Sequence, residues 1–391
     1  MASIKLKHSG GNGVIIAAPT SNPASDKTLT LPSDVDGTVV SKDSSNSLQN
    51  IAGINGGQLG NRNLIINGAM QVAQRGSASS TINGLATVDR FKKIGAGLGN
   101  TFSQEQITLS SSDTPYSSGF RKAFRVSQDQ AGTANASGAI DFSHYIEAQN
   151  LACSGWNYTS ASSKITLQFW FRASTNQTFY GVLYTQDGTK QTYPFSFTAS
   201  GNNVWTKITH TIPGNSNITI NNDNGTGLIL YLIPFYGTDY TDNSKSVNAW
   251  SAHSTNFCPD MASTWLTAGA STFDVTGMQL EVGDTATDFE HRSFAQELVL
   301  CQRYYFQGDG QELGASLNNY YGCMYGTNNA MIKVSFPTTM RAKPTVTTPS
   351  SHSGGGTFSN VYENFTEIVY YITGDDSVSV APSEVKASAE L

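Results

Sequence analysis

Charged side chains are scarce in this sequence of 391 residues: they make up 13%, and the formal net charge is −6. No dense run of Lys and Arg occurs. A protein that neutralises many nucleic-acid phosphates needs such basic clusters, so we expect no nucleic-acid partner. The surface must instead be made polar by Ser, Thr, Asn, Gln and Gly, which indicates a β-rich protein.

Long apolar stretches are also missing. The longest, GLILYLIPFYG at 227–237, is shorter than the ~20 apolar residues that cross a bilayer. The first residues, MASIKLKHSGG, lack the apolar segment of a signal peptide. We therefore expect no membrane insertion, and synthesis and assembly in a cytoplasm.

Cysteine is rare, and its pattern excludes the common metal motifs. There is no CxxC pair and no Cys/His grouping at metal-ligand spacing. We predict reduced, buried core residues, because disulfides are rare in a cytoplasm and free thiols behave as small hydrophobes. The four are Cys153, Cys258, Cys301 and Cys323. The six histidines are dispersed, and no GxSxG or P-loop sequence occurs.

The length predicts two to four domains, since one domain usually takes ~100–200 residues. Changes in composition and in hydrophobic pattern divide the chain into four segments. These are an N-terminal arm and linker at 1–60, a β-sandwich domain at 61–292, a connecting helix at 293–306 and a smaller C-terminal β domain at 307–391.

The arm at 1–60 consists of short alternating pieces, SIKLKH, GVIIAA and KTLTLP, separated by Gly, Pro, Asn and Asp turns. No piece buries a core by itself, and an isolated hairpin is marginal in water. We predict that copies of the arm intertwine or dock on another protein. Residues 41–60 are rich in Ser, Asn and Gly, which predicts a linker.

Strict alternation marks the strands of the main domain, most clearly in KITLQFWFRAS at 164–174. The pattern predicts a core face of Ile165, Leu167, Phe169 and Phe171 and a wet face of Thr166, Gln168, Trp170 and Arg172. Similar runs continue to about residue 292 without helical patterns between them. This favours an antiparallel sandwich over alternating βαβ units.

One helix is predicted, over SFAQELVLCQRYY at 293–305. Ser293 and Gln296 have the spacing of a capping box. Helical spacing places a predicted buried set on one face, namely Phe294, Leu298, Cys301 and Tyr305. Residues 306–391 return to strand-like texture in MIKVSFP, PTVTT, TEIVYYIT and SVSVAPSEVKA, which predicts a smaller sheet.

Three stretches resemble phage tail-fibre and related virion proteins. NLIINGAMQVAQRG (63–76) is similar to the opening strand of a jelly-roll module common in those proteins. FDVTGMQLEVGDTATDFEHRSFAQELVLCQRYYF (273–306) resembles its closing strand and the EL…CQRYY helix after it. VSFPTTMRAKPTVT (334–347) looks like the piece that often follows. The alternating arm with TLTLPS and DGTVV also resembles the N-termini of marine phage fibre proteins.

This resemblance implies a homotrimer in the virion tail fibre, with the N-terminus toward other tail proteins and the C-terminus outward. It also implies a mainly β fold: an antiparallel jelly-roll or β-sandwich with an extended N-terminal arm, one short helix and a smaller C-terminal β domain. The jelly-roll module also resembles carbohydrate-binding modules, some of which hold a structural Ca²⁺. Here the first strand reads Asn67-Gly68-Ala69-Met70 without the usual acidic residue, while Asp274 remains on the closing strand. A structural Ca²⁺ therefore stays open, and no other cofactor is predicted.

Glycan cleavage would need two carboxylates flanking the scissile bond. The only dense acidic cluster is Glu281, Asp284, Asp288 and Glu290. It lies inside the family-like closing segment, where we predict turn and packing roles, and we expect no enzymatic activity.

For glycan binding, aromatic side chains on wet faces are the candidates, because a ring covers the C–H face of a sugar while polar neighbours bond the hydroxyls. The candidates are Trp156, Trp170, Trp205, Trp250 and Trp265, with Tyr320 and Tyr321 of the C-terminal domain and, beside them, Tyr325, Tyr362, Tyr370 and Tyr371. For each one alone, core or edge packing is the competing interpretation.

Three functions follow in order. The first is a tail-fibre protein attached through residues 1–60 that presents its β domains to a host-surface glycan or protein. The second is a purely structural head or tail decoration or adaptor. The third is a glycan-hydrolysing tailspike.

Overall fold

The computed structural model describes residues 3–7, 13–17, 41–42, 48–49, 60–309, 322–326, 329–347, 357–373 and 384–391. The chain divides into two units, Met1–Ile51 and Ala52–Leu391. In the first unit, β1 (Ser3–Lys7) pairs with β2 (Gly13–Ala17), and β3 (Ser41–Lys42) pairs with β4 (Leu48–Gln49). The strands predicted in SIKLKH and GVIIAA are confirmed, whereas KTLTLP lies outside the described residues.

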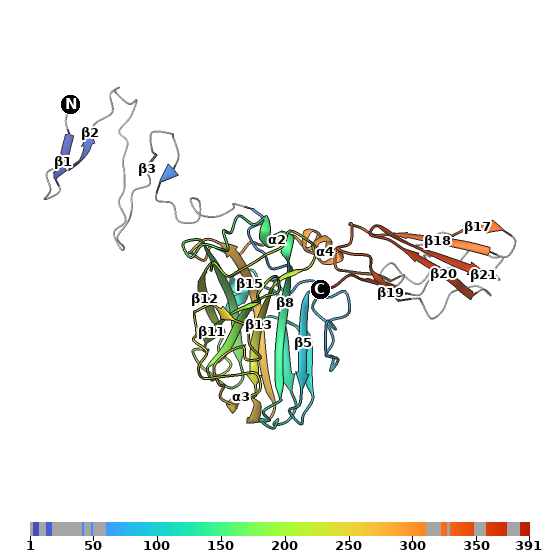
Figure 1. Cartoon of the computed structure of the whole chain (residues 1–391), viewed down its shortest axis with the longest axis horizontal. Coiled ribbons are helices and arrows are strands. Elements are labelled where there is room, and N and C mark those ends of the chain that lie inside the picture. Colours follow the sequence, from blue (N-terminus) through green and yellow to red (C-terminus); the bar gives the residue numbers. More distant parts are fainter. Residues whose placement is uncertain are drawn as a thin grey trace. The chain divides into compact units, whose positions relative to one another are not determined.

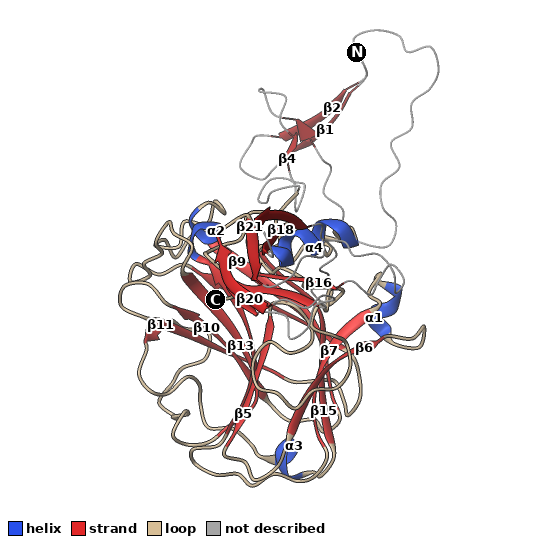
Figure 2. Ribbon diagram, turned by 90° about the vertical axis from the view of Figure 1, so that its right-hand side faces the viewer, coloured by secondary structure: helices blue, strands red, loops and turns tan. Residues whose placement is uncertain are grey.

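The second unit contains a sandwich of two antiparallel sheets (Figure 1, Figure 2). One sheet has the order β14 (Ser251–Ala252), β11 (Gln191–Phe197), β10 (Phe179–Thr185), β13 (Thr226–Tyr236), β8 (Ala139–Glu147) and β5 (Phe91–Ala96). The other has the order β12 (Thr206–Pro213), β9 (Lys164–Ala173), β15 (Ser271–Val282), β7 (Lys122–Gln128) and β6 (Phe102–Thr108). Three short helices connect strands: α1 (Thr114–Ser117), α2 (Ala148–Ala152) and α3 (Thr264–Thr267). The predicted mainly β fold with an antiparallel sandwich is confirmed.

Aromatic side chains fill the space between the two sheets. Phe171 of β9 contacts Phe197 of β11 at 5.0 Å and Phe273 of β15 at 5.2 Å between ring centroids. Phe179 of β10 meets Phe273 at 5.1 Å. Burying each such ring stabilises the fold by ~1.5–3 kcal/mol. The core face predicted for β9 is confirmed, since Ile165, Leu167, Phe169 and Phe171 are fully buried.

The outer face predicted as wet on β9 is partly wrong. Thr166 and Gln168 are buried, because residues 283–292 fold back over this part of the sheet. The Thr166 hydroxyl donates to the Gly283 carbonyl at 2.9 Å, and the Gln168 amide donates to the Thr287 carbonyl at 2.6 Å. Only Trp170 and Arg172 remain half-buried. The alternation therefore predicts correctly which side chains of β9 share the outer face. It does not predict the loop that covers Thr166 and Gln168.

The predicted helix is α4 (Phe294–Gln302), and its capping box is confirmed: the Ser293 hydroxyl accepts from the Gln296 backbone N–H, and the Gln296 side chain accepts from Ser293 N–H. Three details differ. The helix ends at Gln302 and Tyr305 starts β16 (Tyr305–Asp309), because this segment pairs with β22 (Glu384–Ser388). Phe294, predicted buried, is 55% exposed, and Leu298 is only partly buried.

The C-terminal part forms two small antiparallel sheets where one was predicted. The first has the order β16, β22, β19 (Thr345–Thr347). The second has the order β17 (Gly322–Gly326), β18 (Asn329–Ser335), β21 (Glu367–Thr373), β20 (Thr357–Glu363). One hydrophobic core contains residues of both sheets. Its buried members include Val334, Ile368, Tyr370 and Val385. Of SVSVAPSEVKA, only the end is described, and it forms β22.

An ion pair and a hydrogen bond to the buried Glu147 join the sandwich to the chain after α4. Glu147 at the end of β8 is fully buried and accepts from Arg303 Nη2 and the Tyr304 hydroxyl, both at 2.7 Å. The backbone N–H of Ala389 donates to the Tyr304 carbonyl at 2.8 Å. Removing one partner of such a pair usually costs ~3–5 kcal/mol, because the other charge stays buried. The start of β16 and the C-terminal residues are thereby fixed together.

Two of the four cysteines confirm the predicted burial. Cys258 and Cys301 are buried, and burial raises the pKa of both thiols. Cys153 is exposed, which makes that prediction wrong: it is the C-cap of α2 and lies at a turn. The side chain of Cys323 lies outside the described residues.

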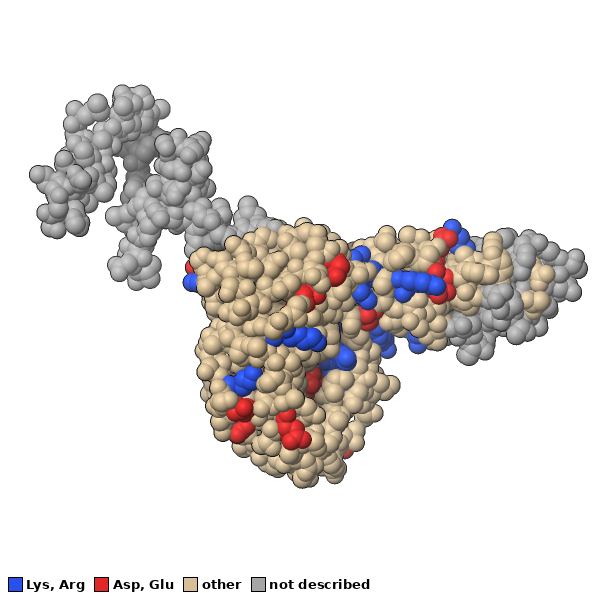
Figure 3. Space-filling model, viewed as in Figure 1, with Lys and Arg blue, Asp and Glu red and all other residues tan. Residues whose placement is uncertain are grey.

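The visible face of the molecule carries few charges. In Figure 3, Lys and Arg gather only in small separate groups among uncharged residues, as the composition predicts. None of the helices within the described ranges combines the length and hydropathy needed to cross a bilayer.

Candidate functional site

Three of the predicted tryptophans are buried, which contradicts their placement on wet faces. Trp156, Trp205 and Trp265 all lie in hydrophobic clusters. The indole N–H of Trp265 donates to the Thr272 carbonyl at 2.9 Å, and that of Trp205 donates to the Asp113 carboxylate at 2.8 Å. These rings sit near loops in the sequence but turn inward, so they offer no face to a ligand.

The remaining aromatic candidates are divided. Trp250 is half-buried; its indole N–H donates to the Pro213 carbonyl at 2.7 Å, and its ring packs against Tyr193. Tyr370 is buried, whereas Tyr362 is exposed and touches Tyr371. Tyr320 and Tyr321 lie outside the described residues, as does the side chain of Tyr325.

Trp170 lines a recess of about 330 Å³ on the outer face of the five-stranded sheet. The recess is enclosed by Ser117, Ser118, Phe120, Gln168, Trp170, Lys207, Gly277, Asp288, Phe289 and His291. These residues come from β9, β12, β15, the end of α1 and the 283–292 loop. The strand pairing of β9 with β12 sets Lys207 directly opposite Trp170. We call this feature the Trp170 recess.

A cluster of three aromatic side chains forms one side of the Trp170 recess. Phe120 and Phe289 meet edge to face at 4.8 Å, and His291 lies 4.9 Å from Phe289 and 5.2 Å from Phe120 between ring centroids. His291 Nε2 is 2.9 Å from the Ser118 carbonyl oxygen, which fixes the imidazole.

Gly277 makes this packing possible. It lies at an irregularity in the pairing of β15 with β9 and has a φ of +63°. A Cβ at this position would come within 2.6 Å of the Phe120 ring. Only glycine adopts this backbone conformation without strain and leaves room for the ring.

The Trp170 recess combines the chemistry that a sugar requires. The half-buried Trp170 indole and the half-buried Phe289 ring supply apolar surface, and the buried Phe120 ring supports Phe289 from behind, while the exposed Lys207, Asp288 and His291 side chains supply hydrogen-bonding groups at the rim. Amphipathic aromatic rings with a few polar neighbours suit such partly wet contacts.

A second aromatic surface lies on the outer face of the six-stranded sheet. Tyr184, Tyr231 and Tyr145 form a row across β10, β13 and β8: Tyr184 and Tyr231 are 6.4 Å apart, and the Tyr231 and Tyr145 side chains share a hydrogen bond. Lys190 and Lys92 lie over the outer rings, at 5.6 and 5.4 Å from the centroids. We call this the tyrosine row. Phe257 packs on Tyr184 and Tyr231, so their rings are largely covered.

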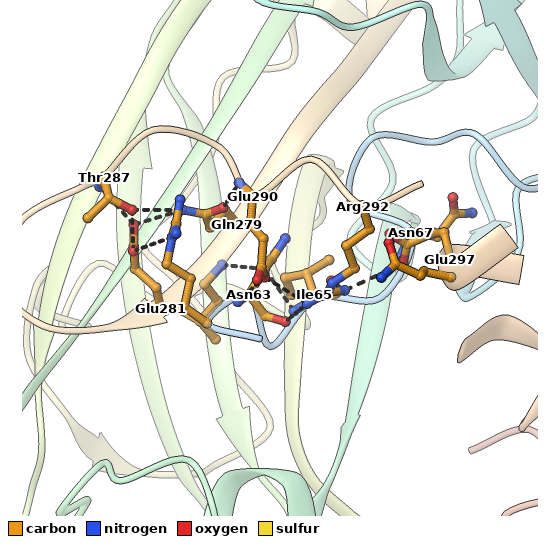
Figure 4. Close-up of polar contacts among 12 residues, drawn as sticks. Asn63, Ile65, Asn67, Gln279, Glu281, Thr287, Glu290, Arg292 and Glu297 are labelled. Carbon is orange, nitrogen blue, oxygen red and sulfur yellow. Dashed lines mark hydrogen bonds and ion pairs between the residues drawn. The ribbon is translucent and has the colours of Figure 1, made fainter. Parts of the chain in front are cut away.

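The acidic cluster has structural partners (Figure 4). The Glu281 carboxylate accepts from the Thr287 backbone N–H at 2.9 Å and from the Thr287 hydroxyl at 2.6 Å. Glu290 accepts from the Asn63 backbone N–H at 2.9 Å and from Arg292 at 3.0 Å. Asp284 and Asp288 are exposed. The predicted turn and packing roles are therefore confirmed for Glu281 and Glu290.

The protonation of Glu290 fits a structural role. Burial raises its pKa, but the backbone hydrogen bond from Asn63 and the charge of Arg292 outweigh burial and hold the pKa below the ordinary value. A general acid of a glycosidase needs the opposite shift.

The environment of Asp274 does not fit the structural Ca²⁺ that the sequence left open. Asp274 is fully buried, and both of its carboxylate oxygens accept hydrogen bonds from guanidinium groups: Arg125 Nε at 2.7 Å and Arg172 Nη2 at 2.7 Å. A Ca²⁺ ion needs several free oxygen ligands together. Within the described residues, no three His, Cys, Asp or Glu side chains gather as metal ligands.

No family model matches this chain, and no curated protein matches it. Several solved structures are weakly similar to it. One is the enzymatically active domain of tailspike protein 4 of bacteriophage CBA120, with a TM-score of 0.30 and 9% identity over 56% of this chain and 21% of that one. A carbohydrate-binding module described as CBM4 has a TM-score of 0.28 and 10% identity over 56% of this chain and 99% of that one.

The tripod from the baseplate of bacteriophage Tuc2009 has a TM-score of 0.25 and 13% identity, and covers 71% of this chain and 84% of its own. The chain spans only about a fifth of the length of the CBA120 tailspike structure described above. TM-scores this low assign no function to this chain.

Sequence reasoning found Trp170 but missed its partners. Alternation in β9 marks Trp170, whereas Phe120, Phe289 and His291 come from segments far apart in the sequence. The tyrosine row was missed as well, although the same alternation in GVLYT and GLILYLIPFY contains its signal.

Proposed function

We propose that this chain is a phage tail-fibre component that attaches to the virion through residues 1–60 and binds a host-surface glycan in the Trp170 recess. The observation that carries the binding site is the recess itself: a volume of about 330 Å³ with a half-buried indole, a half-buried phenyl ring and charged rim groups. The virion role is supported by the resemblance of residues 63–76, 273–306 and 334–347 to phage fibre proteins.

The proposed fibre is not an enzyme. The carboxylate oxygens of Glu281 and Glu290 accept hydrogen bonds within the fold. The sequence suggests no other pair of carboxylates for glycan cleavage. Polysaccharide hydrolysis by the purified chain that disappears in Glu281→Gln or Glu290→Gln would overturn this part of the proposal.

The test is binding of the full chain to polysaccharide extracted from susceptible cells. Trp170→Ala removes the ring that would cover the sugar, so we expect binding to weaken about 10- to 100-fold, the range of a central aromatic contact. Tyr231→Ala in the tyrosine row is the matched control and should bind like the original chain. Thermal unfolding of both variants checks that they fold.

Each other outcome contradicts the proposed site. Loss of binding only in Tyr231→Ala would move the site to the tyrosine row. No binding by the original chain, with the protein folded, would favour the purely structural decoration or adaptor role.

A further inference from the structure

The Trp170 recess lies at one edge of the five-stranded sheet. β12 is an edge strand of that sheet, and β9 is the next strand inward. On the outer face of β12, Lys207 stands opposite Trp170 and Thr209 stands opposite Gln168. Neighbouring strands are ~4.8 Å apart, so a ligand that covers Trp170 reaches one strand spacing in from the edge.

The segment at 110–120, which contains α1, forms one wall of the recess. It packs on the sheet through a hydrophobic cluster that includes Phe120 and Trp205. The Asp113 carboxylate accepts hydrogen bonds from Arg172 Nη1 at 2.9 Å and from the Trp205 indole N–H at 2.8 Å. Trp205 directly precedes β12, so this wall reaches the edge of the sheet at Trp205.

The loop at 283–292 forms the second wall. Its Thr287 carbonyl accepts from the Gln168 side-chain amide at 2.6 Å. Its Asp284 carbonyl accepts from the Thr211 hydroxyl of β12 at 3.2 Å. The second wall therefore reaches the edge of the sheet at Thr211.

The two walls meet on the side away from β12. There the Phe120 and Phe289 rings are in contact, with 4.8 Å between their centroids. His291 Nε2 lies 2.9 Å from the Ser118 carbonyl oxygen, which joins the same two segments a second time. This junction closes the inner end of the recess.

The end of the recess over β12 stays open. Between Trp205 and Thr211, which hold the two walls, the outer face of β12 carries Lys207 and Thr209. Both side chains are exposed. The Trp170 recess is therefore blind: it has one opening over the edge strand and a closed end.

We infer that the Trp170 recess binds the terminal sugar of a glycan chain or branch, and that the rest of the glycan leaves over β12 between Lys207 and Thr209. The inference rests on the proposed glycan binding and specifies which part of the glycan binds. A polysaccharide held by an internal sugar needs two exits, and the contact of Phe120 with Phe289 closes one of them. A terminal sugar needs one exit and can still lay its apolar face on the Trp170 ring.

Thiol labelling tests the path of the bound glycan. The background is the full chain with Cys153→Ser/Cys323→Ser, in which the two remaining cysteines are buried. One thiol is then added, by Thr209→Cys at the opening or by Arg121→Cys, next to Phe120 but outside the recess. Both positions are exposed. With saturating polysaccharide from susceptible cells, we expect maleimide labelling at least 10-fold slower for Thr209→Cys and unchanged for Arg121→Cys.

The length of the glycan gives a second test. Oligosaccharides of increasing length that share one terminal sugar, prepared from the same polysaccharide, are titrated into the full chain. A recess that holds only the end predicts affinities equal within about 2-fold from about two to about six sugar units, because the added units lie outside the recess. An affinity that rises at least 10-fold over this range would overturn the inference.

Two labelling results would also overturn it. Slower labelling of both thiols would mean that the glycan runs past the closed end, and unchanged labelling of Thr209→Cys with bound polysaccharide would mean that it does not leave over β12. Thermal unfolding of each variant checks that the chain is folded. Trp170→Ala separates the two proposals: if it weakens binding while both thiols are protected, only the terminal-sugar inference falls. Absence of polysaccharide binding by the original chain would overturn the proposed function and this inference with it.

Discussion

At the scale of single residues, Asp141 on β8 shows the cost of a buried charge. One carboxylate oxygen accepts from the Tyr236 hydroxyl at 2.9 Å, and the other is buried without a partner. Burial raises the pKa of Asp141 to about 7, although the Tyr236 hydrogen bond and the charge of Lys92 lower it. The folded protein therefore keeps the Asp141 proton at pH values where the unfolded chain has lost it.

Asp141 should make stability fall as pH rises. Between about pH 4 and about pH 7 the folded state binds more protons than the unfolded state, so the free energy of unfolding declines, by up to about 4 kcal/mol for a shift of this size. Asp141→Asn keeps an acceptor for Tyr236 and does not ionise. Urea unfolding of both proteins at several pH values measures the difference.

The comparison between the two proteins removes the contribution of other titrating groups. His144 lies on the same strand, and burial lowers its pKa. Its titration therefore makes stability rise with pH, and it contributes equally to the unfolding free energy of both proteins. A difference in unfolding free energy that stays constant from pH 4 to pH 8 would contradict the assigned role of Asp141.

At the scale of elements, the irregularity in β15 shapes the Trp170 recess. Gly277→Ala places a methyl group at a φ of +63° and within 2.6 Å of the Phe120 ring. We expect a loss of roughly 1–3 kcal/mol in the free energy of unfolding, together with weaker polysaccharide binding because Phe120 must move. Denaturant unfolding and the polysaccharide assay measure these effects.

Gly269→Ala is a suitable control for Gly277→Ala. Gly269 also has a positive φ, of +93°, but no atom lies near the position of an added Cβ. It should reduce stability through backbone strain and leave glycan binding unchanged. Equal effects of both substitutions on binding would show that Gly277 does not shape the recess.

The elements also show how far the sequence could predict this protein. Alternation in β9 and the capping box of Ser293 and Gln296 act over a few residues, so both were predicted correctly. Coverage of Thr166 and Gln168 by the 283–292 loop and the inward turn of Trp265 depend on tertiary packing. The pairing of Asp274 with Arg125 and Arg172 joins three strands, and no local sequence pattern predicts it.

At the scale of the whole molecule, the proposed attachment through residues 1–60 affects how tightly the Trp170 recess could hold a cell surface. A single shallow site binds a glycan weakly. In the predicted homotrimer, three copies would present three such sites at once, and linked sites can gain ~10²–10⁴ in avidity without any new contact. The predicted homotrimer and the proposed binding site therefore depend on each other for tight attachment to a cell.

The most direct test of this account is competition for phage adsorption. Susceptible cells are incubated with the purified full chain, and adsorption of the phage whose tail fibre we propose it to be is then measured. We predict that the original chain and Tyr231→Ala block adsorption, whereas Trp170→Ala does not at the same concentration. Undiminished adsorption in the presence of the folded, oligomeric chain, or equal blocking by Trp170→Ala, would contradict glycan attachment through the Trp170 recess.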